Sequence, residues 1–200
     1  GATTTVGHGL GVKPSLFIIK NRSATSNWFT YTDVIDGSLD FLYLNSTDAK
    51  IDSGLSAPTT SVFTVNSSTA PNTNTIIAYC FAEKQGYSKF GSYIGNGNAN
   101  GAFIYTGFKP AWVLIKRSDG ATNWRLFDSK RSGFNGDTSQ LYPNLTNAED
   151  SAGDQIDLLS NGFKNRTASG DQNISGASYI YMAFAENPFT TSTGIPATAR

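Results

Sequence analysis

The sequence predicts an all-β protein made of two tandem, related antiparallel β-sandwiches of the jelly-roll kind. First, the chain repeats itself: GLGVKPSLFIIKNRSATSNWFTY, starting at Gly9, returns as YTGFKPAWVLIKRSDGATNWRLF, starting at Tyr105. Second, the apolar runs are short, rich in β-branched and aromatic residues, and separated by Ser, Thr, Asn and Gly, which is typical of strands and turns. A repeat of this length is too long for a solenoid and fits one small sandwich.

Two landmarks set the register of the repeat. Pro14 returns as Pro110, an offset of 96 residues (110 − 14). The run IIAYCFAE, ending at Glu83, returns as YIYMAFAE, ending at Glu186, an offset of 103 (186 − 83). The second copy therefore carries about seven extra residues between these landmarks (103 − 96).

The register also predicts the domains. A strand-like stretch at 89–96 precedes the second copy and has no counterpart before the first. We therefore predict a first sandwich over residues 1–90 that lacks its first strand, and a second over 91–200 that ends in an extended tail. Because the chain begins without Met, we expect it to be a piece of a longer polypeptide.

Five strands are predicted in each copy. The first follows Lys-Pro, because proline at the start of a strand removes no ladder donor. The second follows a polar connector, which indicates an antiparallel hairpin. The last is apolar on both faces, as expected of a strand buried between two layers. No helical spacing persists for the ~11 residues of a typical helix, so at most one helical turn is expected, near 147–150. The predicted strands are 16–20, 28–31, 41–44, 62–65 and 76–81, then 112–116, 124–127, 140–142, 162–164 and 179–184.

Composition excludes several classes of partner. Lys and Arg number 15, Asp and Glu number 15, and no basic run reaches five residues, which argues against nucleic-acid binding and anionic membranes. The apolar runs fall far short of the ~18 residues of a membrane span. Cys80 is the single cysteine and is predicted to be a small buried residue. No metal or cofactor is predicted.

Candidate catalytic groups do not converge. Glu83 and Glu186 are one per copy, whereas glycoside hydrolysis needs two carboxylates at one bond; we expect each to bind backbone amides or an Arg. The acids in 149–157 match no calcium loop. His8 has no G-x-S-x-G partner motif, and the Gly-rich 95–101 lacks the Lys-Ser/Thr of a phosphate loop. The sequence therefore predicts a non-enzyme.

The tryptophans leave two interpretations open. Trp28 and Trp124 each follow an asparagine, Asn27 and Asn123. They can be buried core residues at equivalent sites, since aromatic residues dominate sandwich packing. Alternatively, the indoles are platforms for sugar rings and the asparagines hold hydroxyl groups. Trp112 stands opposite Leu16 in the first copy, which predicts an exposed aromatic residue specific to the second copy and a further candidate for ligand stacking.

The motifs also carry a resemblance. The segments KFGSYIGNGNANGAFIYTGFKPAWVLIKR, TNWRLFDSKR, LYPNLTNAE, LLSNGFKNR and SGASYIYMAFAENPF together resemble a family of uncharacterised β-rich domains found in structural proteins of tailed, especially marine, bacteriophages. The resemblance implies a non-enzymatic tail fibre, appendage or capsid decoration protein at the surface of an extracellular virion. Its partners would be other virion proteins and copies of itself. One alternative is a glycan-binding adhesin or receptor-binding module that contacts a host glycan; another is a polysaccharide depolymerase.

The missing strand predicts an assembly surface. A sheet that lacks a strand exposes unpaired N–H and C=O groups, which are a template for pairing. The Thr-rich start of the chain, residues 2–6, has neither charge nor proline to protect such an edge. We expect the edge to be covered by a strand from upstream or from a neighbouring subunit. The tail after Phe189 either reaches that neighbour or leads to a further domain.

Overall fold

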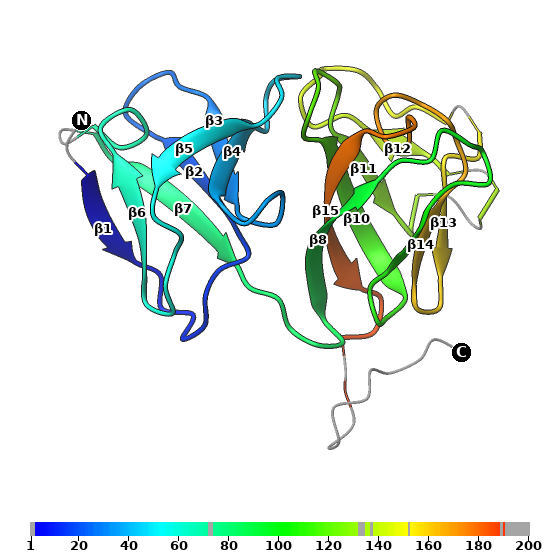
Figure 1. The fold of residues 1–200 in the computed structure, drawn as a ribbon, viewed down its shortest axis with the longest axis horizontal. Helices are drawn as coiled ribbons and strands as arrows, with labels where there is room; N and C mark the ends of the chain where they lie inside the picture. Colours follow the sequence, from blue (N-terminus) through cyan, green and yellow to red (C-terminus); the bar gives the residue numbers. More distant parts are fainter. Residues whose placement is uncertain are drawn as a thin grey trace.

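The protein is all-β. The computed structural model describes residues 3–71, 74–131, 135–136, 138–151, 153–188 and 190. These residues form antiparallel strands and contain no helix, so the predicted fold class is confirmed. The helical turn expected near 147–150 is wrong: Asp150 there forms an isolated bridge with Gln140. The strands form two sandwich-like halves that lie side by side (Figure 1).

The first half has a five-stranded sheet in the order β5-β4-β3-β2-β7, covered on one face by the pair β1-β6. All pairings are antiparallel, and the hairpin predicted between the first two repeat strands is β2-β3. The strands are β1 (Thr3–Gly7), β2 (Leu16–Asn21), β3 (Trp28–Thr32), β4 (Leu39–Tyr43), β5 (Ile51–Leu55), β6 (Val62–Asn66) and β7 (Ile76–Phe81).

The second half has a five-stranded sheet in the order β12-β11-β10-β15-β8 and a three-stranded sheet in the order β13-β14-β9. Strand β8 starts at Ser88 and pairs along β15, so the boundary predicted between residues 90 and 91 falls inside a strand. The halves instead meet in the connection between β7 and β8 (Figure 1). The strands are β8 (Ser88–Ile94), β9 (Phe103–Tyr105), β10 (Pro110–Arg117), β11 (Arg125–Asp128), β12 (Gln140–Leu141), β13 (Ile156–Leu159), β14 (Gly162–Asn165) and β15 (Ser178–Ala185).

The repeated sequence landmarks take the same places in the two five-stranded sheets. Strands β2, β3, β4 and β7 correspond to β10, β11, β12 and β15, and each set runs in the same order. Two strands of the second half have no such counterpart: β8, beside β15, and β13, beside β14. By its place in the chain β13 corresponds to β5, but β5 pairs with β4 whereas β13 pairs with β14.

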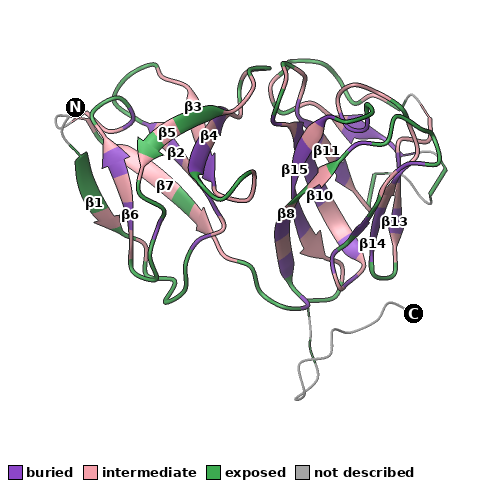
Figure 2. Ribbon diagram, viewed as in Figure 1, coloured by how far each residue is buried: buried purple, intermediate pink, exposed green. Residues whose placement is uncertain are grey.

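Three apolar clusters hold the protein together. One lies inside the first half, around Phe17 and Phe63, and one inside the second half, around Val113 and Phe163. The third joins the halves and contains Leu16 from β2 together with buried residues of β8, β10 and β15. Strands β2 and β10 are therefore packed on both faces, which explains their nearly continuous apolar runs. Buried residues concentrate on β10 and β15 (Figure 2).

Polar contacts also join the halves. The backbone N–H of Lys50 donates to the carbonyl oxygen of Ser118 at 2.8 Å, and that of Thr122 donates to Thr47 at 2.9 Å. The ammonium group of Lys116 is fully buried here and donates to the Thr47 carbonyl at 3.2 Å. The loop after β4 is thereby fastened to the loop after β10.

Candidate functional site: the unpaired edge of β7

Strand β7 ends its sheet without a neighbour on one side. It pairs with β2, whereas its counterpart β15 pairs with both β10 and β8. No strand among the described residues pairs with the free side of β7. The Thr-rich start of the chain is not this edge, because it forms β1 and pairs with β6. The missing strand thus leaves its gap beside β7.

The hydrogen-bond pattern shows which backbone groups face the gap. The N–H of Arg22 donates to the carbonyl of Thr75 at 2.8 Å, and antiparallel ladders alternate in direction from residue to residue. Residues 77, 79 and 81 therefore face β2, and the N–H and C=O groups of Ile76, Ala78 and Cys80 face outward. Their equivalents on β15, Tyr179, Tyr181 and Ala183, pair with Tyr93, Gly91 and Lys89 of β8.

The lack of a β8 counterpart changes burial. The side chains of β15 that match β7 are buried except for the half-buried Phe184, whereas all those of β7 are half-buried or exposed. Tyr79 is 43% exposed, while the matching Met182 is 4% exposed. The same contrast is visible between β7 and β15 in Figure 2.

The β7 edge also lacks the features that usually protect an edge strand. Such strands are commonly short, charged or interrupted by proline. Strand β12 has two residues, β5 contains Asp52, and β8 carries Lys89. Strand β7 reads IIAYCF and has neither charge nor proline. Of the edges of the two five-stranded sheets, this one is best suited to accept another strand.

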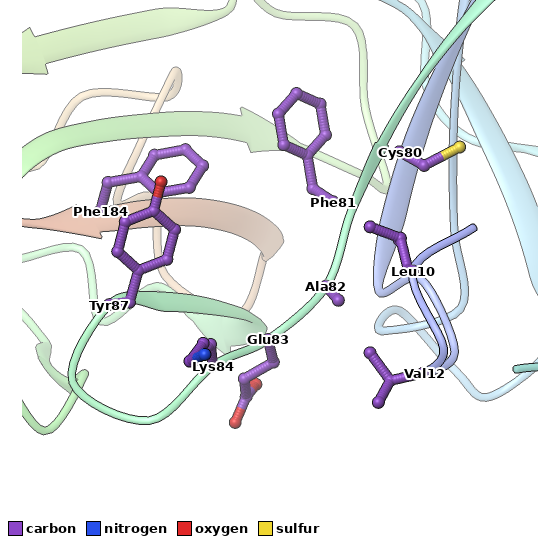
Figure 3. Close-up of a pocket in the computed structure, with 9 residues that line it drawn as sticks. All are labelled: Leu10, Val12, Cys80, Phe81, Ala82, Glu83, Lys84, Tyr87 and Phe184. Carbon is purple, nitrogen blue, oxygen red and sulfur yellow. The ribbon is translucent and has the colours of Figure 1, made fainter. Parts of the chain in front are cut away.

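An open pocket of about 630 Å³ lies at the C-terminal end of the β7 edge (Figure 3). Val12 in its wall is 51% exposed, whereas Phe108, 96 residues later, is 2% exposed. This wall position is therefore uncovered in the first half and buried in the second. Burial raises the pKa of the Cys80 thiol, which keeps it protonated and weakly nucleophilic. The lining residues are Leu10, Val12, Cys80, Phe81, Ala82, Glu83, Lys84, Tyr87 and Phe184.

The candidate asparagines Asn27 and Asn123 have a structural role that the sequence did not reveal. Asn45 accepts a hydrogen bond from the N–H of Trp28 at 2.8 Å and donates one to Asn27 at 3.0 Å. Asn144 makes the same two contacts with Trp124 and Asn123, at 3.0 and 2.9 Å. Each Asn-Trp pair is thus clamped by a downstream asparagine. The repeat does not predict Asn45 and Asn144 as partners, because they lie 99 residues apart (144 − 45) whereas the two tryptophans lie 96 apart (124 − 28).

The three candidate tryptophans differ in position. Trp124 is 1% exposed in the cluster between the halves, and its indole N–H donates to the Tyr43 carbonyl at 2.9 Å; a stacking role for Trp124 is therefore wrong. Trp28 is only half-buried, with the Lys20 ammonium group over its ring, so the prediction of equivalent buried indoles is also wrong. The halves contact each other asymmetrically, which is why only one indole is enclosed. The prediction that Trp112 is exposed is wrong as well: Trp112 is half-buried against Phe184, at 5.6 Å between ring centroids.

The candidate catalytic groups are occupied by ion pairs. Glu83 binds Lys89 at 2.6 Å and Glu186 binds Lys109 at 2.8 Å, so the partner is lysine and the expected Arg or amide partner is wrong. His8 lies 3.2 Å from the carbonyl oxygen of Thr59.

The acidic stretch and the Gly-rich loop are likewise held by the protein. Asp154 and Asp157 both pair with Arg166, at 3.2 and 3.4 Å. In the part of the chain that is described, no three His, Cys, Asp or Glu residues gather to hold a metal, and no helix is long and apolar enough to cross a membrane. The Gly-rich loop binds the buried Asn173, whose amide donates to the Asn98 carbonyl at 2.9 Å. A side chain at Gly95 would meet the Ile174 carbonyl, so glycine is needed there for packing.

Comparison with known proteins places the chain in a family. A search of curated proteins and a search of solved structures each found no match. The family described as Domain of unknown function (DUF7483) matches residues 1–188 and so covers both halves, including the edge of β7 and the pocket beside it. The chain therefore belongs to the DUF7483 family.

Proposed function

We propose that this protein is a non-enzymatic structural component of a phage virion, a tail fibre, appendage or capsid decoration, that assembles through the unpaired edge of β7. The observation that carries the assembly role is that edge. The backbone N–H and C=O groups of Ile76, Ala78 and Cys80 face outward, on the side where the second half holds β8. Strand addition to a sheet edge is a general mode of protein assembly. The phage setting rests on the resemblance of the repeated motifs to domains of phage structural proteins.

The chemistry of the described surface agrees with a structural role. The repeated carboxylates are each neutralised by a lysine. The pocket beside β7 is walled mainly by apolar side chains, and its single thiol stays protonated. An apolar pocket next to an open sheet edge suits the binding of a polypeptide segment better than the activation of a nucleophile.

The proposed function can be tested on purified phage particles. Antibodies against this chain should label purified virions of the phage that encodes it. Ala78→Pro removes an outward N–H and blocks the edge while sparing the bonds to β2; phage carrying it should make particles without this protein. A purified virion that lacks the protein, or a variant that assembles normally, would overturn the proposal.

A specific observation favours glycan binding as the second candidate function. Phe103 and Tyr105 are both exposed on the outer face of β9, with Ile104 buried between them. Lys164 stands opposite Phe103 and donates to Asn100 at 2.6 Å. Two aromatic rings beside polar groups can stack on sugar rings. A glycan array should show binding that Phe103→Ala and Tyr105→Ala both abolish; binding lost instead with Trp28→Ala would move the site to that indole.

A further inference from the structure

We infer that the outer face of the sheet β13-β14-β9 binds an uncharged, linear oligosaccharide, two sugar units of which stack on Phe103 and Tyr105. This inference rests on the second candidate function and names its ligand class and mode of binding. The five-stranded sheet of the second half packs one face on the first half and the other on β13, β14 and β9. The outer face of these three strands is therefore turned away from the junction of the halves (Figure 1).

The first half shows that the fold does not require aromatic residues on this face. Phe163 at the centre of β14 matches Phe63 of β6, since both are buried in the same place of their half. Aligning the two ladders on this pair matches β9 with β1. The places of the two exposed rings are then held on β1 by a threonine and a glycine, Thr5 and Gly7. The rings are therefore a feature of the second half alone.

Both rings lie over glycine residues. A Cβ atom added to Gly162 would lie 3.1 Å from Cε2 of Phe103, and one added to Gly107 would lie 3.6 Å from the Tyr105 hydroxyl. Each ring therefore contacts a stretch of backbone without a side chain, which covers one side of the ring and leaves the other open. The exposed fractions, 47% for Phe103 and 64% for Tyr105, agree with one open side. Sugar rings stack on such open aromatic faces.

The two rings are spaced along a single line. Residues i and i+2 of a strand point to the same face and lie about 7 Å apart along it, a distance comparable to the length of one sugar unit. A linear chain that runs along β9 therefore meets both rings. Strand β9 is the edge of its sheet, so no neighbouring strand among the described residues blocks this path.

The polar groups beside the rings are balanced in charge. Asp157, Lys164 and Phe103 form one row across the three strands, so their side chains share the outer face. The Lys164 ammonium group donates to Asn100 at 2.6 Å and has further protons to donate, whereas Asp157, at 3.4 Å from Arg166, accepts. A donor beside an acceptor suits hydroxyl groups, which are both, and neighbouring opposite charges favour no ionic ligand. A neutral sugar is therefore the class that fits.

The test presents the complete chain to an array of linear oligosaccharides of increasing length. The array carries neutral glucose, galactose and mannose oligomers together with uronate and sulfated oligomers. Neutral oligomers should bind, and a chain long enough to reach both rings should bind about tenfold more tightly than its monomer, as expected for one further stacked ring. Titration calorimetry measures these affinities, which should hardly change when salt is added, because no ion pair forms with the ligand.

Variants of the two rings test the site. Phe103→Thr and Tyr105→Thr remove exposed rings, so the melting temperature should stay near that of the wild type. Each should weaken binding of the best neutral oligomer about tenfold. Tyr79→Thr is the matched control, because Tyr79 is similarly exposed but lies on β7, and it should leave the affinity unchanged. Equal losses in all three variants, or no loss in the first two, would overturn the inference.

A pair of aspartates separates contact with the sugar from support of Arg166. Asp157 and Asp154 both pair with Arg166, at 3.4 and 3.2 Å, but only Asp157 stands in the row with Lys164. Asp157→Asn should weaken binding several-fold, because hydrogen bonds to a carboxylate are stronger than those to a neutral acceptor. Asp154→Asn should not weaken it. An equal loss in both variants would overturn the assignment of Asp157 to the site.

The outcomes separate the inference from the functions proposed above. Binding confined to uronate or sulfated oligomers, and weakened by salt, would overturn the neutral ligand class and leave glycan binding standing. Binding that Trp28→Ala abolishes and Phe103→Thr leaves intact would also keep that function but overturn this site. An array without any binding would overturn both the inference and the second candidate function. The structural function is tested independently by the experiments on virions.

Discussion

The indole N–H of Trp124 donates a hydrogen bond of 2.9 Å to the carbonyl oxygen of Tyr43, across the junction of the two halves. The ring is enclosed by the cluster that contains Leu16, Leu42 and Leu114. Trp28, which has the same place in the repeat, is half-buried beside Lys20. The junction is therefore built around one tryptophan of a repeated pair.

Removal of the Trp124 side chain should be far more costly than removal of the Trp28 side chain. Trp124→Ala empties a fully buried site and is expected to lower the free energy of unfolding by about 3–5 kcal/mol. Trp28→Ala should lower it by about 1 kcal/mol, because its ring already contacts solvent. Urea denaturation of both variants measures the difference. Equal losses would contradict the asymmetric junction.

Proline substitutions along β7 should reveal which N–H groups bond to β2. Ala78→Pro removes an outward N–H and should leave the fold nearly as stable as the wild type. Tyr79→Pro removes an N–H that faces β2 and should cost at least about 2 kcal/mol, because a ladder bond is lost and its acceptor stays unpaired. Thermal denaturation compares the two neighbours. A larger loss of stability in Ala78→Pro than in Tyr79→Pro would show that the N–H of Ala78, and not that of Tyr79, bonds to β2.

The buried ammonium group of Lys116 should make stability rise with pH above neutrality. Burial lowers the pKa of Lys116 to about 8, below its ordinary value of about 10.5. Between these values the unfolded chain keeps a proton that the folded protein releases. The free energy of unfolding should therefore increase from pH 8 to 9.5, by at most about 1.4 kcal/mol per pH unit.

Two variants test this assignment. Lys116→Met should abolish the increase, whereas Lys20→Met, at the equivalent place in the first half, should retain it. The window stops at pH 9.5 because burial raises the pKa of tyrosines such as Tyr31, and their ionisation at higher pH favours unfolding. Stability that falls from pH 8 to 9.5 in the wild type would contradict the role of Lys116.

The ion pair between Arg125 and Asp171 should stabilise the second half. Arg125 is buried, binds Asp171 at 2.8 Å and lies over the ring of Tyr142. Asp171→Asn removes the carboxylate and is expected to cost about 3 kcal/mol, because a buried charge loses its counter-charge. Glu149→Gln, which breaks a more exposed pair with Arg131, should cost less than about 1 kcal/mol. Chemical denaturation of both variants checks this contrast.

Burial of Arg125 shows where the sequence misleads. Its counterpart at the offset of 96 residues is Phe29, which packs against the rings of Phe41 and Tyr43. The repeat therefore suggests an apolar position, yet the second half places a guanidinium group there, bonded to Gln140 and Asp171. Gln140 and Asp171, which bond to this guanidinium group, lie 15 and 46 positions after Arg125 in the chain, so no local sequence pattern predicts these contacts.

The candidate site was only partly predictable. The absence of a counterpart to residues 89–96 can be read from the repeat, because the register leaves those residues unmatched. The position of the open edge requires the strand order. Only the sheets show that β8 lies beside β15, so that the open edge of the first half is β7 and not the Thr-rich start of the chain. The predicted tail beyond Phe189 lies outside the described residues, apart from Thr190.

The sequence by itself determined the all-β class and most of the strands, because alternation, β-branched residues and turn residues act over a few neighbours. It did not predict β1, β5, β9 and β13. It also determined the correspondence of the two copies, which needs no coordinates. The tertiary structure alone decided which faces of the two copies meet, which tryptophan is enclosed and which edge is left open. These features depend on contacts between residues far apart in the chain, and local propensity carries no information about them.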